Sequence, residues 1–248
     1  MKSLSRIGYG TFKLGRNQEI KYPTPYDLPN QKEATRLIES LYLQGVTYFD
    51  TAPSYGDAET KLGMALQSIG IQPFERQIST KIGEYFNPKT KSYYHDFSSK
   101  KINESVERSL NELKTDSIDI LFIHAFYPDV KIVQQTALLD TLKLLKQKGI
   151  VHSIGFSGYT NEAFELIFND LDAAMVEYHP QKKDLLPTIE RMGEGQKLVI
   201  LKKILGAGVL NPETALRFAL SNPNVSSVLM TSLNLKHIQQ NLSFAQMI

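Results

Sequence analysis

Four ionisable residues are spaced so that they could move a proton during carbonyl chemistry. Asp50 ends a short apolar run, and Tyr55 follows it five residues later. Lys81 ends a second run of the same kind, and His124 ends a third. The pKa of a free tyrosine, about 10, is too high for efficient proton exchange at neutral pH, but a neighbouring ammonium favours the phenolate. If the three runs are parallel strands of one barrel, the four side chains meet at one rim, where Tyr55 could exchange a proton with a carbonyl oxygen.

Taken singly, three of these residues have ordinary structural explanations. Asp50 could cap a strand end, Lys81 could be a solvated loop residue, and His124 could be a hydrogen-bonded core histidine. What favours catalysis is the coincidence of all four at one predicted rim, because active sites of such barrels are built from the carboxyl ends of strands and the loops that follow them.

The elements that must position these residues alternate regularly. Short β-rich runs and longer amphipathic stretches alternate about eight times. We expect strands at Ser5–Thr11, Thr47–Asp50, Gln77–Lys81, Ile118–His124, Ile150–Gly155, Ala173–Glu177, Lys197–Leu201 and Ser226–Leu229. This alternation predicts parallel strands with right-handed crossovers, and eight units closing on themselves form an α/β protein of the (β/α)8 TIM-barrel type, typically about 250 residues long. We expect residues 1–248 to be one domain. An open doubly wound sheet is the alternative, weakened because no G-x-G-x-x-G follows a strand.

Local signals support the helices of this plan. Asn30 and Glu33 form a capping-box pattern before an apolar helix face, residues Lys101–Leu113 have helical spacing, and Gly149 should stop the helix after the fourth strand. The aromatic segment Glu84–Ser99 is long for a strand-to-helix loop, and we expect it beside the catalytic face.

Composition limits the partners. The 28 basic residues nearly balance the 26 acidic ones, so neither nucleic acid nor a membrane surface is expected as a partner. Cysteine is absent, which excludes disulfides and Cys-ligated zinc, and we expect no metal cofactor. Residues 1–6 contain no apolar segment typical of a secretion signal, and no run approaches the roughly 20 apolar residues of a spanning helix. A cytoplasmic protein with a small-molecule substrate is expected; its oligomeric state stays open, and a monomer is compatible with the sequence.

The chain resembles the aldo-keto reductase family almost from end to end. Ile7–Thr11 is similar to the family's first strand, Gly45–Ala52 followed by Tyr55-Gly56 and Glu59 is close to its most specific signature, and Ser109–Leu113 through Asp119 to His124 resembles the second. The resemblance implies that Tyr55 is the general acid/base, that Asp50, Lys81 and His124 complete a tetrad, and that NADPH or NADH lies extended across the barrel rim without a Rossmann fold.

Cofactor positions are also implied by this resemblance, though three depart from the family pattern. Ser157 matches the usual carboxamide ligand, whereas Gly158 replaces an Asn, Met175 replaces a common Gln, and Lys202 falls about where an aromatic ring often stacks on the nicotinamide. The remaining implied cofactor contacts are Gly10, Thr11, Thr231, Ser232, Lys236, His237, Gln240 and Asn241. NADPH is slightly favoured, but NADH stays open because a neutral histidine is a poor substitute for arginine beside a 2′-phosphate.

We therefore expect an NAD(P)(H)-dependent oxidoreductase acting on an aldehyde, a ketone or a sugar hemiacetal. The stretch after Lys81 is similar to the subgroup that oxidises sugars at C1, although Ala125 replaces the Asp that commonly follows the histidine there. An aromatic wall could come from Tyr85, Phe86, Tyr93, Tyr94, Phe97 and Phe126. The alternatives are a nicotinamide-sensing regulatory or scaffold protein on the same barrel, and a barrel lyase or isomerase that uses no nicotinamide.

Overall fold

Eight parallel strands close into a barrel in the computed structural model, which describes residues 4–20 and 25–246. Around the barrel their order is β1-β10-β9-β8-β7-β6-β3-β2. The strands are β1 (Ile7–Gly10), β2 (Tyr48–Asp50), β3 (Gln77–Ile82), β6 (Ile118–His124), β7 (Val151–Ser157), β8 (Ala173–Glu177), β9 (Leu198–Lys202) and β10 (Ser227–Met230). The predicted (β/α)8 barrel is confirmed, and the open-sheet alternative is wrong. Residues 1–3, part of the segment predicted to carry no secretion signal, lie outside the described residues.

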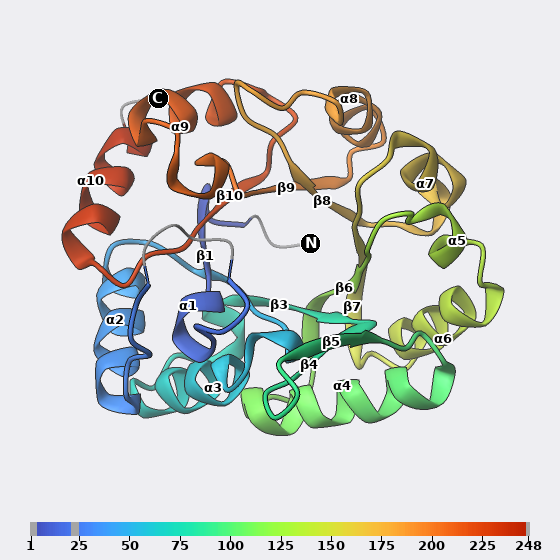
Figure 1. Cartoon of the computed structure of the whole chain (residues 1–248), viewed down its shortest axis with the longest axis horizontal. Coiled ribbons are helices and arrows are strands. Elements are labelled where there is room, and N and C mark those ends of the chain that lie inside the picture. Colours follow the sequence, from blue (N-terminus) through green and yellow to red (C-terminus); the bar gives the residue numbers. More distant parts are fainter. Residues whose placement is uncertain (1–3, 21–24, 247–248) are drawn as a thin grey trace.

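Helices surround the barrel, as Figure 1 shows. The α-helices are α1 (Phe12–Gly15), α2 (Gln31–Leu43), α3 (Ala58–Ser68), α4 (Ser99–Leu113), α5 (Val130–Val133), α6 (Thr136–Gln147), α7 (Asn161–Leu166), α8 (Leu186–Glu194), α9 (Pro212–Leu220) and α10 (Leu235–Gln246). Short 3₁₀ segments are η1 (Pro53–Tyr55), η2 (Pro73–Glu75), η3 (Phe168–Asp170) and η4 (Gly206–Gly208). Among the described residues, none of these helices is long and apolar enough to cross a membrane.

The predicted helix signals are confirmed. Asn30 and Glu33 form a reciprocal capping box at the start of α2, and Ser98 caps α4 by accepting a hydrogen bond from the backbone N–H of Lys101. Gly149, two residues beyond α6, has a φ of +73°, a conformation that favours glycine.

The strands position the site through their two-residue side-chain period. Residues of β2, β6, β8, β9 and β10 form the apolar cluster inside the barrel, with members Tyr48, Ile120, Phe122, Ala173, Met175, Ile200 and Leu229, joined by Leu4. The alternate residues, such as Phe49, Leu121 and Ile123, belong to the larger cluster between strands and helices. Counting in steps of two from the inner residues reaches Asp50, His124 and Lys202, so the side chains at these strand ends share the inward face.

The aromatic segment after β3, expected as a long loop, has secondary structure of its own. It is an antiparallel hairpin of β4 (Glu84–Asn87) and β5 (Ser92–His95), with Glu84 opposite His95. Gly83 precedes it with a φ of +99°, and a Cβ there would lie 1.9 Å from the Phe97 ring. Glycine is therefore required where the chain leaves β3 and turns into the hairpin.

Candidate active site

A buried ion pair lies at the centre of the predicted rim. Lys81 Nζ is 2.7 Å from both carboxylate oxygens of Asp50 and donates a further hydrogen bond of 2.7 Å to the Thr51 carbonyl. Asp50 also accepts a 2.7 Å bond from the Ser79 hydroxyl, whose oxygen is 2.8 Å from the Tyr48 hydroxyl. Both charged side chains are almost fully buried. The lysine is thus fixed in one position, with a carboxylate and a backbone carbonyl accepting hydrogen bonds from its ammonium group.

Burial and charge act on this lysine in opposite directions. Burial lowers the pKa of Lys81, while the Asp50 carboxylate favours the ammonium form and offsets part of that effect. The result is a cation held at a fixed place in a region of low polarity, where its effect on a neighbouring phenol is larger than in water.

Tyr55 is the phenol beside this cation. Lys81 Nζ lies 4.9 Å from the centre of the Tyr55 ring, and the ring packs edge-on to Phe12 with the centroids 5.0 Å apart. Tyr55 ends η1, and Gly56 follows with a φ of +68°. A Cβ on Gly15 would lie 2.1 Å from the Tyr55 carbonyl oxygen, so two glycines let the segment after β1 press directly on the turn that carries the tyrosine.

His124 completes the group. Its ring stands nearly perpendicular to that of Tyr55, with the centroids 6.3 Å apart. Burial first, and then the charges of Lys81 and Lys202, hold the pKa of His124 well below its usual range. A histidine with such a pKa is neutral at pH 7 and can exchange hydrogen bonds with an oxygen without adding charge. The structure therefore brings the four predicted catalytic side chains together.

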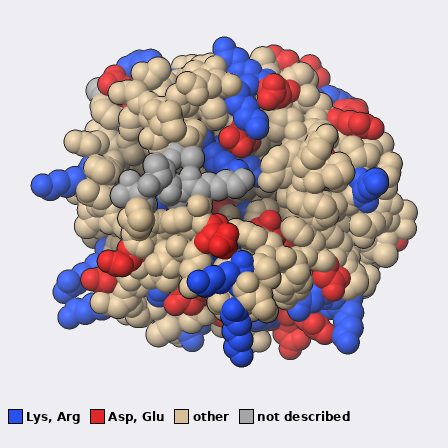
Figure 2. Space-filling model, viewed as in Figure 1, with Lys and Arg blue, Asp and Glu red and all other residues tan. Residues whose placement is uncertain are grey.

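The tetrad opens into a cavity of about 1590 Å³. This exceeds the roughly 300–1000 Å³ of typical small-molecule sites and suits an elongated ligand with a second molecule beside it. Figure 2 shows the hollow at the centre of this face, with charged side chains in and around it. Predicted residues that line the cavity are Asp50, Tyr55, His124, Gly10, Met175, Lys202, Thr231, Ser232, His237, Gln240 and Asn241.

Other predicted residues lie near the cavity without lining it. Thr11 and Ser157 are fully buried, and Lys236 is exposed at the start of α10. Gly158 is buried too, and a Cβ there would lie 2.2 Å from the Phe156 ring, so this position accepts no larger side chain without movement of that ring. Ser157 reaches the cavity indirectly, because its hydroxyl accepts a 2.7 Å hydrogen bond from Lys202 Nζ.

Glu84 belongs to this cavity and was not among the predicted site residues. From the first position of the hairpin it places one carboxylate oxygen 3.3 Å from His124 Nδ1 and the other 3.5 Å from His95 Nε2. Nδ1 of His124 makes no hydrogen bond among the described residues, and with the imidazole neutral its contact with Glu84 is one of proximity and not an ion pair. The sequence shows only that Glu84 follows closely after the strand that carries Lys81. The hairpin is what turns the Glu84 side chain back toward the site, and the sequence alone did not predict the hairpin.

The side chains of the predicted aromatic wall are divided, some lining the cavity and others packing in the core. Tyr93 and Phe126 line the cavity, whereas Tyr85 and Phe97 are buried. Tyr94 stacks on Tyr85 with ring centroids 5.2 Å apart. The predicted aromatic wall is therefore formed only in part, by Tyr93 of the hairpin and by Phe126 from the loop after β6.

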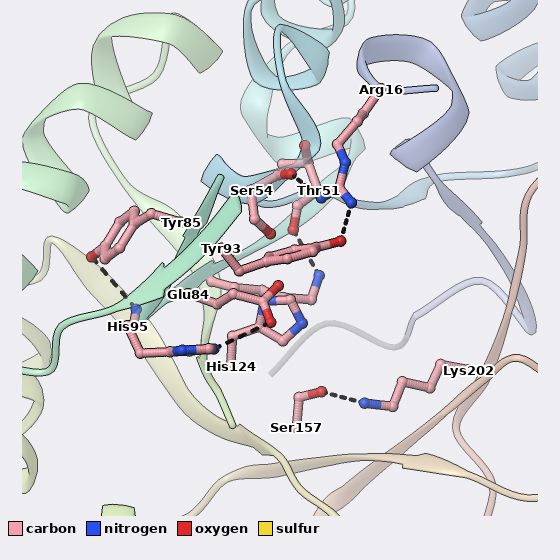
Figure 3. A network of polar contacts seen from close by, with 12 residues as sticks. Arg16, Thr51, Ser54, Glu84, Tyr85, Tyr93, His95, His124, Ser157 and Lys202 are labelled. Atoms are coloured by element: carbon pink, nitrogen blue, oxygen red, sulfur yellow. Dashed lines mark hydrogen bonds and ion pairs between the residues drawn. The ribbon is translucent and has the colours of Figure 1, made fainter. Parts of the chain in front are cut away.

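Arg16 is a second residue that the sequence analysis did not identify. Its guanidinium lies 4.0 Å from the centre of the Phe86 ring and 4.5 Å from that of Tyr93, and it also donates a hydrogen bond to the Tyr93 hydroxyl. It donates a further bond of 3.0 Å to the carbonyl of Ser54, next to Tyr55. Figure 3 shows this residue linking the hairpin to the turn that carries the tyrosine.

We expect Arg16→Lys to loosen the hairpin. Lysine keeps the charge but loses the planar stacking and the forked hydrogen bonds, so amides of residues 84–95 should exchange with solvent deuterium about tenfold faster. The matched control is Arg217→Lys on α9, where the arginine is 57% exposed and its guanidinium lies 3.6 Å from the Glu213 carboxylate. Equal protection of the hairpin in the two variants would show that Arg16 does not hold it.

A tyrosine beside a buried lysine–carboxylate pair lies at the mouth of a (β/α)8 barrel, the face on which enzymes of this fold build their active sites. The family model described as the aldo/keto reductase family matches residues 6–214. The chain belongs to this family and is an NAD(P)-dependent oxidoreductase.

Individual relatives agree with this assignment. L-Galactose dehydrogenase of Arabidopsis thaliana is 25% identical over 97% of this chain and 84% of its own length. D-Arabinose 1-dehydrogenase of Saccharomyces cerevisiae is 33% identical over 54% of this chain and 38% of its own length. A crystal structure of a putative aldo-keto reductase from Pseudomonas aeruginosa superposes with a TM-score of 0.87 at 31% identity, covering 98% of this chain and 90% of the other.

Proposed function

We propose that this protein transfers a hydride between a nicotinamide dinucleotide and a carbonyl or sugar hemiacetal, with Tyr55 as the general acid/base. The observation that carries the proposal is the ammonium of Lys81, fixed by Asp50 at 2.7 Å and lying 4.9 Å from the Tyr55 ring. In the reducing direction Tyr55 donates its proton to the carbonyl oxygen, and the Lys81 charge stabilises the phenolate that remains. In the oxidising direction the phenolate removes the proton of the substrate hydroxyl.

The cavity suits the cofactor that the family uses. When bound, the nicotinamide accepts or donates the hydride, and the protein must hold it with its reactive carbon next to the substrate. We propose that Met175, Lys202 and Ser157 bind the nicotinamide end, and that Thr231 and Ser232 bind phosphate. A Cβ on Gly10 would lie 2.7 Å from Thr231 Oγ1, so this glycine leaves room for the polar segment to border the cavity. The other proposed contacts are Thr11, Gly158, Lys236, His237, Gln240 and Asn241.

We propose a slight preference for NADP(H) over NAD(H). His237 lines the cavity, as do Thr231 and Ser232 of the proposed phosphate-binding segment, whereas the neighbouring Lys236 does not line it. A histidine neutralises a 2′-phosphate less well than an arginine, which keeps the proposed preference small.

For the substrate, we propose an aldose or a related polyhydroxylated hemiacetal. Glu84, His95 and Phe126 border the cavity beside the tetrad, and a carboxylate, an imidazole and an aromatic ring together suit a molecule with several hydroxyls and an apolar face. Two relatives named above are, by name, sugar dehydrogenases, which supports the same class.

The test is calorimetric titration with NADP⁺, NADPH, NAD⁺ and NADH, followed by absorbance at the reduced-nicotinamide band with a panel of aldoses and simple aldehydes. We expect NADP⁺ and NADPH to bind more tightly than NAD⁺ and NADH, and we expect turnover with at least one aldose. If none of the four dinucleotides bound, the proposal would be overturned. Tight binding without turnover across the panel would favour the sensing protein instead.

A further inference from the structure

Lys202 occupies an unusual position for a cation. It ends β9 on the inward face of the barrel and lines the same cavity as Tyr55. Its Nζ donates a 2.7 Å hydrogen bond to the Ser157 hydroxyl and lies 5.3 Å from the centre of the Tyr159 ring (Figure 3 shows the bond to Ser157). Among the described residues, its hydrogen-bond partner is therefore a neutral hydroxyl rather than a carboxylate.

The nearby acidic group is already shared by other cations. Glu177 lies opposite Lys202 in the register of β8 and β9, yet its carboxylate is within 3.7 Å of Lys203 Nζ and within 3.8 Å of Lys182 Nζ. His179 approaches the same carboxylate at 3.6 Å. Lys202 is thus left with little compensating charge.

Burial first, and then repulsion from Lys203 and Lys81, lower the pKa of Lys202 to about 7. Glu177 and Asp50 act in the opposite direction but do not cancel this effect. The titratable and charged groups around the amine are Lys203, Lys81, Asp50, Glu177, His124, Tyr159 and His179. Lys202 therefore changes its charge near physiological pH.

This charge lies within reach of the reacting atoms. Lys202 is one of the cations that lower the pKa of His124, so its field extends to the tetrad. A ring that delivers or takes a hydride must lie against the substrate carbon whose oxygen exchanges a proton with Tyr55, and so within the cavity that Tyr55, Met175 and Lys202 all line. The oxidised nicotinamide ring carries a positive charge, and the reduced ring carries none.

We propose that Lys202 is a specificity-determining residue for the oxidation state of the cofactor: its ammonium weakens binding of the oxidised form relative to the reduced form. This inference rests on the proposed function. The consequence is that the equilibrium between enzyme-bound species is shifted toward oxidation of the substrate, because the site binds the reduced cofactor better than the oxidised one. Oxidation removes a hydride from the substrate carbon and a proton from the substrate hydroxyl. The hydride goes to the nicotinamide and the proton goes to Tyr55, and no other oxidant is needed.

The test measures dissociation constants, not activity. NADP⁺ and NADPH are titrated by calorimetry at about pH 6 and about pH 9, and the ratio of the oxidised to the reduced dissociation constant is taken at each pH. Phosphate and adenosine contacts are common to both forms and cancel in this ratio. We expect the ratio to fall about tenfold as the pH rises, because deprotonation of Lys202 removes the repulsion.

Three variants assign the effect. Lys202→Met should show the low ratio at both pH values, and Lys202→Arg should keep the high ratio at both, since arginine stays charged. Lys143→Met removes an exposed cation of α6 that pairs with Asp170 at 2.7 Å and does not line the cavity, and it should behave as the unaltered protein does. Thermal melting checks that each variant is folded.

The outcomes separate the two proposals. Failure of the unaltered protein to bind either form would overturn the proposed function. Binding of both forms, with the same ratio in Lys202→Met as in the unaltered protein, would overturn the role of Lys202 while leaving the proposed function intact.

Discussion

Tyr55→Phe should lower kcat by about 10²–10⁴-fold, the usual contribution of a positioned general acid or base. The substitution removes the hydroxyl alone and keeps the ring, which packs against Phe12 with centroids 5.0 Å apart. The affinity for the dinucleotide should change little, because the phenol exchanges its proton with the substrate and not with the cofactor. Steady-state kinetics and calorimetry on the same preparation measure the two effects separately.

The control for this prediction is Tyr127→Phe. Tyr127 is 73% exposed, so loss of its hydroxyl should leave kcat and cofactor affinity unchanged. If Tyr55→Phe behaved like Tyr127→Phe, another group would have to supply the proton, and His124 would be the next to substitute.

Lys81→Met should reduce both stability and turnover. It leaves the Asp50 carboxylate buried with the Ser79 hydroxyl as its remaining side-chain donor, and removal of one member of a buried ion pair costs about 3–5 kcal/mol of unfolding free energy. Turnover should fall as well, because the ammonium that favours the Tyr55 phenolate is then missing. Urea unfolding followed by circular dichroism gives the first quantity, and initial rates give the second.

Two further variants show whether the ion pair itself is responsible. Lys100→Met, at an exposed lysine whose contact to Glu104 is 4.0 Å, should change the unfolding free energy by no more than about 0.5 kcal/mol. The double variant Asp50→Asn with Lys81→Met removes both charges and should regain part of the lost stability without regaining turnover. Recovery of turnover in the double variant would contradict the role given to Lys81.

The sequence was sufficient to predict the barrel, because the two-residue period of strands and the 3.6-residue period of helices can both be seen within short stretches of chain. The short apolar runs predicted the strand positions, and each predicted end lies within two residues of the observed one; a difference of that size is seen for β7, which continues to Ser157. The grouping of Asp50, Lys81 and His124 followed from the same pattern, since parallel strands of a closed barrel end on one rim.

What the sequence did not predict depends on contacts between distant segments. Arg16 binds the hairpin through Phe86 and Tyr93, some 70 residues further along the chain, and no local pattern marks that pairing. The contact of Glu84 with His124 requires the hairpin to fold back over the rim. The bond from Lys202 to Ser157 joins two barrel strands that are separated by β8, and its significance depends on burial, which a sequence alone does not show.

Hydride transfer with Tyr55 as the proton carrier is the central claim, and a single-turnover experiment tests it most directly. The unaltered protein and Tyr55→Phe are each loaded with the oxidised cofactor and mixed with an aldose that the unaltered protein oxidises, while absorbance of the reduced nicotinamide is followed. We predict rapid formation in the unaltered protein and formation at least about 10²-fold slower in Tyr55→Phe. Equal rates in the two proteins would contradict the assignment of Tyr55.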